Sequence, residues 1–152
     1  MNPRFGARQW HAQRKNRYPM LIAALLVTAL LFGGMVLYSF GFAAFVFSAL
    51  PIETAGPTIR RAFPYFYLFV IATSAVAALL LWPSARSLSL AVAAIASTGL
   101  PARQILMPAI NRATDTGAKA RFKRLHGLSV LVTLSHIVLS GWVLSQIPGR
   151  AN

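Results

Sequence analysis

The stretch Pro19–Leu50, PMLIAALLVTALLFGGMVLYSFGFAAFVFSAL, contains no charged residue. A helix needs about 20 consecutive apolar residues to cross the hydrocarbon core of a bilayer, and this stretch is longer than that. The apolar core of a cleaved signal peptide is only about 7–15 residues long, so we expect the segment to be retained. It predicts a first transmembrane helix over about residues 20–45, tilted or continuing past the membrane interface.

The composition of the whole chain also indicates a membrane protein. Hydrophobic residues make up 57% of the 152 residues and charged residues 11%, whereas an average globular domain has roughly 25% charged residues. The formal net charge of +13 is typical of proteins that bind nucleic acid or anionic lipid. The apolar stretches, and the lack of a nucleic-acid-binding motif, favour lipid. We therefore expect the basic loops to contact anionic headgroups, and we expect no nucleic-acid partner.

The segments on either side of the first span are polar. Residues 1–18 form a basic N-terminal arm, which could fold as a short helix at the membrane interface. Its basic residues are Arg4, Arg8, Arg14, Lys15 and Arg17. Residues 51–64 are rich in proline and predict a loop or interfacial segment. The second span follows over residues 65–82, with Tyr65, Tyr67 and Trp82 at its ends, where amphipathic rings favour the headgroup level.

A third and a fourth span complete the prediction. A tight turn at 83–86 leads into a third span over about residues 86–110, which Pro101 and Pro108 should kink or end. Arg103 lies within it and would have to snorkel to the interface. Residues 111–125 predict a basic loop, the fourth span covers 126–147, and 149–152 form a short tail. The fold class is therefore all-α, an integral membrane protein with a four-transmembrane-helix bundle over residues 19–148.

The orientation of the bundle is not decided by charge. With four spans, the two sides of the membrane carry nearly equal numbers of basic residues, so the positive-inside rule does not choose between them. A three-span alternative, with the third segment re-entrant, would gather most basic residues on one side, and the rule favours it. The length of the third segment favours four spans. We expect the membrane to be a bacterial inner membrane.

Small residues recur on two of the predicted spans. Gly34, Gly41 and Ser48 recur every seven residues on the first span, and Ser89, Ala93 and Ser97 every four on the third. Helices in lipid associate largely through close packing of small residues. Both stripes predict contact faces inside the bundle, with a ligand cleft as the less favoured interpretation.

The fourth span carries a polar stripe. It consists of His126, Ser129, Thr133, His136 and Ser140. At about 100° per residue these side chains fall within an arc of about 80°, and Ser135 lies on the opposite face. Polar groups in hydrocarbon usually face the bundle interior, so the stripe should point inward. It predicts interhelical hydrogen bonds or, alternatively, a proton, water or ligand path.

The sequence contains few residues that could form a catalytic site or a metal site. His126 and His136 are too far apart on one helix to bind one ion, and the remaining histidine, His11, lies in the arm. The methionines could offer thioethers to copper but follow no suitable spacing. We expect no metal site and no cofactor, and haem is retained as a weak hypothesis. The two acids, Glu53 and Asp115, lie in predicted loops, so neither paired carboxylates nor another catalytic constellation predicts an enzyme.

Three stretches together resemble the transmembrane protein 205-like family. They are Gly33-Gly34-Met35-Val36 with Phe45–Leu50, then Ala55–Ile59 with Phe63–Tyr67, and lastly Met107–Asn111 with Phe122–Ser129. The Leu125-His126-Gly127-Leu128-Ser129 segment matches the family's Leu-His-x-x-Ser motif at the start of the last helix. The resemblance covers about residues 20–147 and implies a compact four-helix membrane protein. The family is catalogued as a domain of unknown function, and the drug-resistance association of its eukaryotic member hints at transport or trafficking.

Two principal hypotheses about function follow from the sequence. The leading one is an accessory or interaction subunit, or a structural membrane module, in a membrane-protein complex or homo-oligomer. The alternative is a small transporter or channel component that uses the polar stripe of the last helix. A haem- or metal-binding membrane protein is a third hypothesis.

Overall fold

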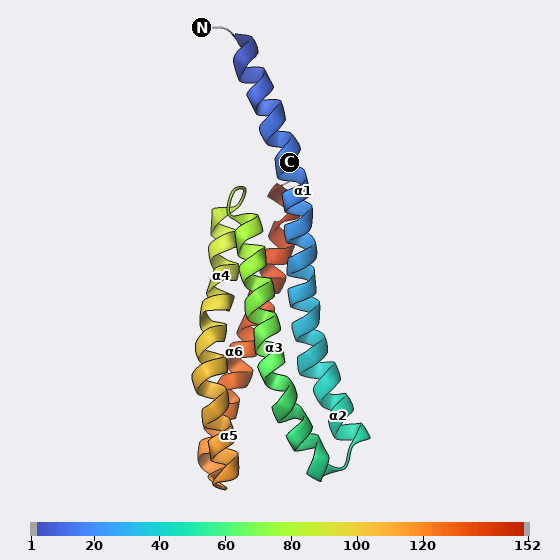
Figure 1. The fold of residues 1–152 in the computed structure, drawn as a ribbon, viewed down its shortest axis with the longest axis vertical. Coiled ribbons are helices and arrows are strands. Elements are labelled where there is room, and N and C mark those ends of the chain that lie inside the picture. Colours follow the sequence, from blue (N-terminus) through green and yellow to red (C-terminus); the bar gives the residue numbers. More distant parts are fainter. Residues whose placement is uncertain (1–2, 151–152) are drawn as a thin grey trace.

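A computed structural model describes the backbone of residues 3–150 and the side chains of residues 18–150. Four helical rods lie side by side, and each is long and apolar enough to cross a membrane (Figure 1). The rods are Tyr18–Ala49, Ile52–Leu81, Arg86–Asp115 and Lys119–Arg150. The predicted all-α fold with four membrane-spanning helices is confirmed, and the third segment is as long as the second, with 30 residues.

The first rod consists of α1 (Pro3–Val36), a π-helical segment η1 (Leu37–Phe42) and α2 (Ala43–Ala49). In η1 the backbone N–H of Ala43 donates to the carbonyl of Tyr38, five residues earlier. This pattern fits one residue more into the turn than an α-helix does. Helix faces beyond η1 are therefore rotated by about one residue's 100° relative to the faces before it.

The second rod is the single helix α3 (Ile52–Leu81), and it corrects the expected loop over residues 51–64. Pro51 caps its start, and the backbone N–H groups of Thr54 and Ala55 both donate to the Pro51 carbonyl. Pro57 and Pro64 lie inside the helix rather than ending it. Ala55 is fully buried and Phe63 packs against the core, so the apolar face continues through both prolines. Figure 1 shows the first turns of α3 leaning away from α5.

The third rod consists of α4 (Arg86–Pro101), the π-helical segment η2 (Ala102–Leu106) and α5 (Met107–Asp115). Pro101 and Pro108 were expected to kink or end this helix, yet the rod runs on to Asp115. The π-helical segment follows directly after Pro101, and the Met107 N–H bonds the carbonyl of Ala102. A local change from α-helical to π-helical hydrogen bonding thus compensates for the N–H group that proline lacks.

The predicted basic loop over 111–125 is mostly helical. It contains the end of α5, a short turn, and the start of α6 (Lys119–Gln146), which the 3₁₀ turn η3 (Pro148–Arg150) follows. Gly117 has φ +65, a conformation that favours glycine. Its N–H bonds the Thr114 carbonyl at 3.1 Å, and the Ala118 N–H bonds the Ala113 carbonyl at 2.9 Å. This pair of bonds is a Schellman motif, which ends α5 and turns the chain into α6.

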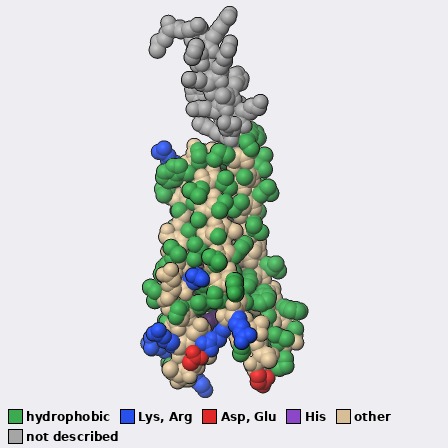
Figure 2. All heavy atoms as spheres, viewed as in Figure 1, with side chains coloured by type: hydrophobic (Ala, Val, Ile, Leu, Met, Phe, Trp, Pro, Cys, Tyr) green, Lys and Arg blue, Asp and Glu red, His purple; other side chains and the backbone are tan. Residues whose placement is uncertain are grey.

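The rods pack as a bundle with one basic end. α3 lies against α1 and α4, and α6 lies against α1, α4 and α5. The core between them is apolar, with Leu31, Met35, Leu81, Leu88 and Ile95 among its largest fully buried side chains. Figure 2 shows Lys, Arg, Asp and Glu side chains gathered mainly at the lower end of the view, where Figure 1 places the turn between α5 and α6, around a notch. Hydrophobic side chains cover most of the surface above that end, as expected for a surface that faces lipid.

Candidate functional site

Polar side chains join the helices at several levels along the bundle, and the first level lies at the basic end. The guanidinium of Arg60, on α3, donates to both carboxylate oxygens of Asp115, on α5, at 2.8 and 3.0 Å. Its Nε also donates to Oδ1 of Asn111 at 3.1 Å. Within residues 18–150 this is the one ion pair. It ties α3 to α5, where the two rods otherwise separate.

The second level is an aromatic and polar layer about two helical turns deeper, since Tyr67 follows Arg60 by seven residues on α3. The hydroxyls of Tyr67 on α3 and Ser129 on α6 are hydrogen bonded at 3.0 Å, and both residues are buried. Tyr38 of η1 stacks on Phe66 of α3, with ring centroids 4.4 Å apart. On the other side of α3, Nε of Arg103 in η2 donates to the Pro64 carbonyl at 3.4 Å. Both π-helical segments therefore contact the same short stretch of α3.

The third level joins α4 to α6. Oγ1 of Thr98 lies 2.7 Å from Nε2 of His136, and the same hydroxyl lies 2.6 Å from the Ala94 carbonyl. A hydroxyl has one proton to donate, and the carbonyl can only accept. With that proton on the Ala94 carbonyl, the imidazole donates through Nε2–H to the Thr98 oxygen. His136 is 8% exposed, so this bond satisfies a buried polar group.

The structure divides the predicted polar stripe of α6. Ser129, His136 and Ser140 are buried, and Ser140 donates to the Ile137 carbonyl of its own helix at 3.0 Å. Thr133 is half-buried. His126 is exposed and stacks on Phe122, with ring centroids 5.4 Å apart, because it lies in the part of α6 beside the splayed basic end. The inward part of the stripe contacts α3 and α4 through hydrogen bonds.

The predicted small-residue stripe of the first span splits at η1. A Cβ at Gly34 would lie 2.5 Å from Cζ of Phe69, so this glycine allows α1 to approach α3 closely. Gly41 and Ser48 are instead exposed, and Ser48 donates to its own helix at the Phe45 carbonyl. The physical reason is the rotation of the helix face that η1 introduces. The expectation of one continuous inward face across η1 was wrong.

The stripe on the third span also turns out of the bundle. Ser89 is buried and donates to the Ala78 carbonyl of α3 at 2.6 Å, an interhelical bond. Ala93 is half-buried, and Ser97 is exposed and donates to the Ala93 carbonyl. Residues spaced by four drift by about 40° per step around a helix. The stripe therefore begins at the α3–α4 contact and ends on the surface.

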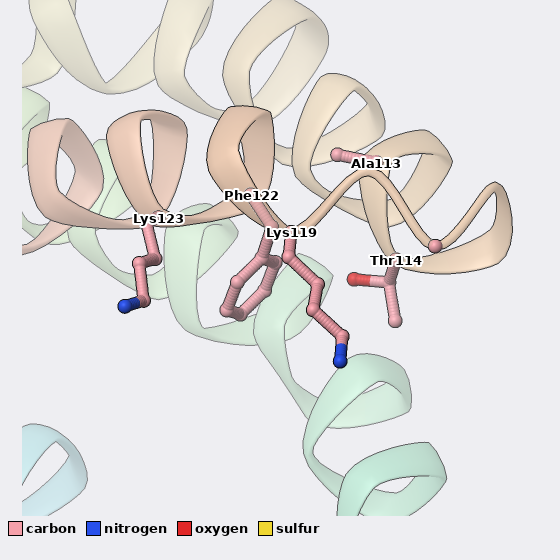
Figure 3. A pocket seen from close by; sticks show the side chains of 6 residues that line it. Ala113, Thr114, Lys119, Phe122 and Lys123 are labelled. Atoms are coloured by element: carbon pink, nitrogen blue, oxygen red, sulfur yellow. The ribbon is translucent and has the colours of Figure 1, made fainter.

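A shallow pocket of about 350 Å³ lies at the α5–α6 turn (Figure 3). Its lining residues are Ala113, Thr114, Gly117, Lys119, Phe122 and Lys123. A second pocket of about 330 Å³ lies between α4 and α6, beside Thr98 and His136, with an otherwise largely apolar lining. Sequence patterns gave no signal for either pocket, because each is made by residues from two helices.

The residues that pair with the predicted stripe were missed by the sequence interpretation. Tyr67 was assigned to the membrane interface, whereas it is buried and bonded to Ser129. Thr98 and Asn111 were not singled out. A polar residue inside an apolar span is a signal that could have identified Thr98, but no single-helix pattern identifies its partner.

Candidate ligands for a metal ion or haem are scattered among the described side chains. No group of three or more His, Asp or Glu residues among them lies close enough to hold a metal ion. His136 already bonds Thr98, and His126 lies at the surface. His11, the remaining histidine, lies outside the described side chains.

Comparison with known proteins gives one match. A family model described as a domain of unknown function (DUF4149) matches residues 26–119, well over half of the chain. The match extends from α1 through the first three rods to the first residue of α6, so the polar stripe of α6 lies beyond it. No curated protein matches the chain, and no solved structure matches it.

Proposed function

This chain belongs to the DUF4149 family of unknown function, and we propose that it acts as an accessory or interaction subunit, or a structural module, within a membrane. In this proposal it is not an enzyme. The observation that carries the proposal is the split of the small-residue stripe at η1. Gly34 is used inside the bundle, and the small residues beyond η1 face outward.

The outward face consists of Gly41, Ala44 and Ser48, which we call the Gly41 face. All three residues are exposed along η1 and α2. A face of small residues lets another helix approach closely, and in lipid such packing is a main source of helix association. The proposed occupant is a transmembrane helix of a partner protein or of a second copy of this chain.

Copurification in a mild detergent tests this proposal. Wild-type protein is expected to elute with a partner or as a dimer, and the double variant Ala44→Leu/Ser48→Leu is expected to lose that association. The matched control is Ala72→Leu, which places the same side chain at an exposed alanine of α3. A wild-type protein that elutes alone, with neither a partner nor self-association, would contradict the proposal.

The transport alternative rests on the polar stripe of α6. The hydrogen bonds of Ser129 to Tyr67 and of His136 to Thr98 support a packing role for its inward part. The transport hypothesis predicts that His136→Ala and Thr133→Val change flux or ligand binding in proteoliposomes. Unchanged activity in both variants would remove it.

Further assignments from the sequence complete the proposal. We further propose kinship with the transmembrane protein 205-like family, which the sequence resemblance over about residues 20–147 supports and which implies the same four-span architecture. We also propose that the membrane is a bacterial inner membrane. For the haem hypothesis, the test is an absorption spectrum of the purified protein, in which a Soret band would show bound haem.

A further inference from the structure

The pocket at the α5–α6 turn combines two cations with an apolar wall. Lys119 and Lys123 lie four residues apart, which places them on one side of α6. Phe122 lies between them and forms the wall together with Ala113. Figure 3 shows the two lysine side chains and the Phe122 ring projecting from the same side of the first turns of α6, with the ring between the two ammonium groups.

The two lysines have no acidic partner among the described residues. The single ion pair of residues 18–150 uses Asp115, whose two carboxylate oxygens both accept hydrogen bonds from Arg60. The other acid, Glu53, lies in the first turn of α3 and forms no ion pair. Two like charges at this spacing repel each other, and an anion between them would relieve the repulsion.

The depth of the pocket matches that of a lipid headgroup. The exposed apolar surface of α6 begins at Leu128, which is 49% exposed. Lys123 lies five residues before it, about 8 Å along a helix. The headgroup layer of one leaflet is roughly 5–8 Å thick. If the hydrocarbon begins near Leu128, Lys123 lies at the level of lipid phosphates, and Lys119 lies about one helical turn further out, on the aqueous side.

We propose that this pocket is a binding site for one anionic phospholipid. The phosphate binds between the ammonium groups of Lys119 and Lys123, and the glycerol backbone lies against Phe122. Lysine binds phosphate as a point charge, so the site requires no bidentate geometry. The wall distinguishes an amphiphile from a free anion, because inorganic phosphate has nothing to place against an aromatic ring.

The test uses the full chain in a neutral detergent, with native mass spectrometry to count bound phosphatidylglycerol. Phosphatidylcholine with the same acyl chains is the zwitterionic lipid control. The variant Lys119→Gln/Lys123→Gln should weaken phosphatidylglycerol binding roughly tenfold or more. The matched control is Arg121→Gln/Arg124→Gln, which removes the same charge from the same helix outside the pocket and should change binding less than about threefold.

Several outcomes would overturn the proposal. Equal losses in the two double variants would show diffuse attraction to a basic surface. Displacement of the lipid by millimolar inorganic phosphate would show a simple anion site. If the glutamine pair fails to fold, Phe122→Ala and Lys119→Arg/Lys123→Arg decide, because only the first should weaken lipid binding. Unchanged binding in Phe122→Ala would reject the pocket. These results do not depend on the Gly41 face, so either proposal can fail alone.

Discussion

The Arg60 guanidinium and the Asp115 carboxylate form two parallel hydrogen bonds, Nη1 to Oδ1 at 2.8 Å and Nη2 to Oδ2 at 3.0 Å. They connect α3 and α5 across the basic end of the bundle. A bidentate pair fixes orientation as well as distance. The Arg60 side chain is 38% exposed and that of Asp115 60%, so the pair is in contact with solvent and should set the spacing of the two helices more than the global stability.

Replacing Arg60 with Gln should therefore widen the distance distribution between α3 and α5 while leaving the thermal unfolding midpoint nearly unchanged. The chain has no native cysteine, so spin labels at Glu53→Cys and Thr116→Cys report this distance without background. The control is Arg61→Gln, an exposed neighbour outside the pair. Broadening in both variants, or in neither, would contradict the tether. High salt should broaden the wild-type distribution as well, because it screens an exposed pair.

A larger residue at Gly34 should destabilise the contact between α1 and α3. A Cβ there would lie 2.5 Å from the Phe69 ring, so Gly34→Leu should overpack the α1–α3 contact and destabilise the protein by about 1–3 kcal/mol. Unfolding in detergent followed by circular dichroism measures this change. Gly33→Leu is the control, because nothing lies within 4 Å of a Cβ at that position. Phe69→Ala should partly rescue Gly34→Leu, and a lack of rescue would place the strain elsewhere.

The bond between Thr98 and His136 should contribute modestly. Hydrogen bonds between membrane helices average about 0.6 kcal/mol in double-mutant cycles, and we expect a coupling of that size here. The cycle combines Thr98→Val with His136→Phe and measures unfolding for each variant. Ser97→Ala serves as the control, because Ser97 is exposed and bonds only its own helix. A coupling of zero would mean that the two residues do not interact in the membrane.

The number of spans has a direct test in accessibility. With four spans, the turn that contains Pro83 and the turn that contains Thr116 lie on opposite sides of the membrane. Single cysteines at these exposed positions should therefore react with a membrane-impermeant maleimide from opposite faces of oriented vesicles. The three-span alternative, with a re-entrant third segment, predicts labelling from the same face.

The sequence predicted the existence of the four helices better than the residues at which they begin and end. Long apolar runs identified four rods because hydrophobic length is a property of each segment alone. The limits failed where proline was taken as an end signal, as at Pro57 and Pro64. In these helices, packing on one face and a change to π-helical bonding compensate for the missing N–H.

Which side chains point into the bundle was predicted correctly only where the helix keeps a regular rotation of about 100° per residue. Ser129, His136 and Ser140 lie on an uninterrupted α-helix, and their common inward face was predicted from a rotation of 100° per residue. Gly34 and Gly41 lie on opposite sides of the start of η1, which that regular phase does not describe. The partners Tyr67 and Thr98 come from other helices, and one helix's periodicity carries no information about them.

The extra residue in η1 makes the outer surface of this protein sensitive to chain length. Loss of a single codon within residues 37–42 would let the first rod become a continuous α-helix. The apolar length of the rod would hardly change, so the chain would still insert and cross the bilayer. Ala44 and Ser48 would nevertheless turn through about 100° and no longer present the same surface to the lipid. One small deletion would thus change the surface that the first rod presents without any substitution on that surface.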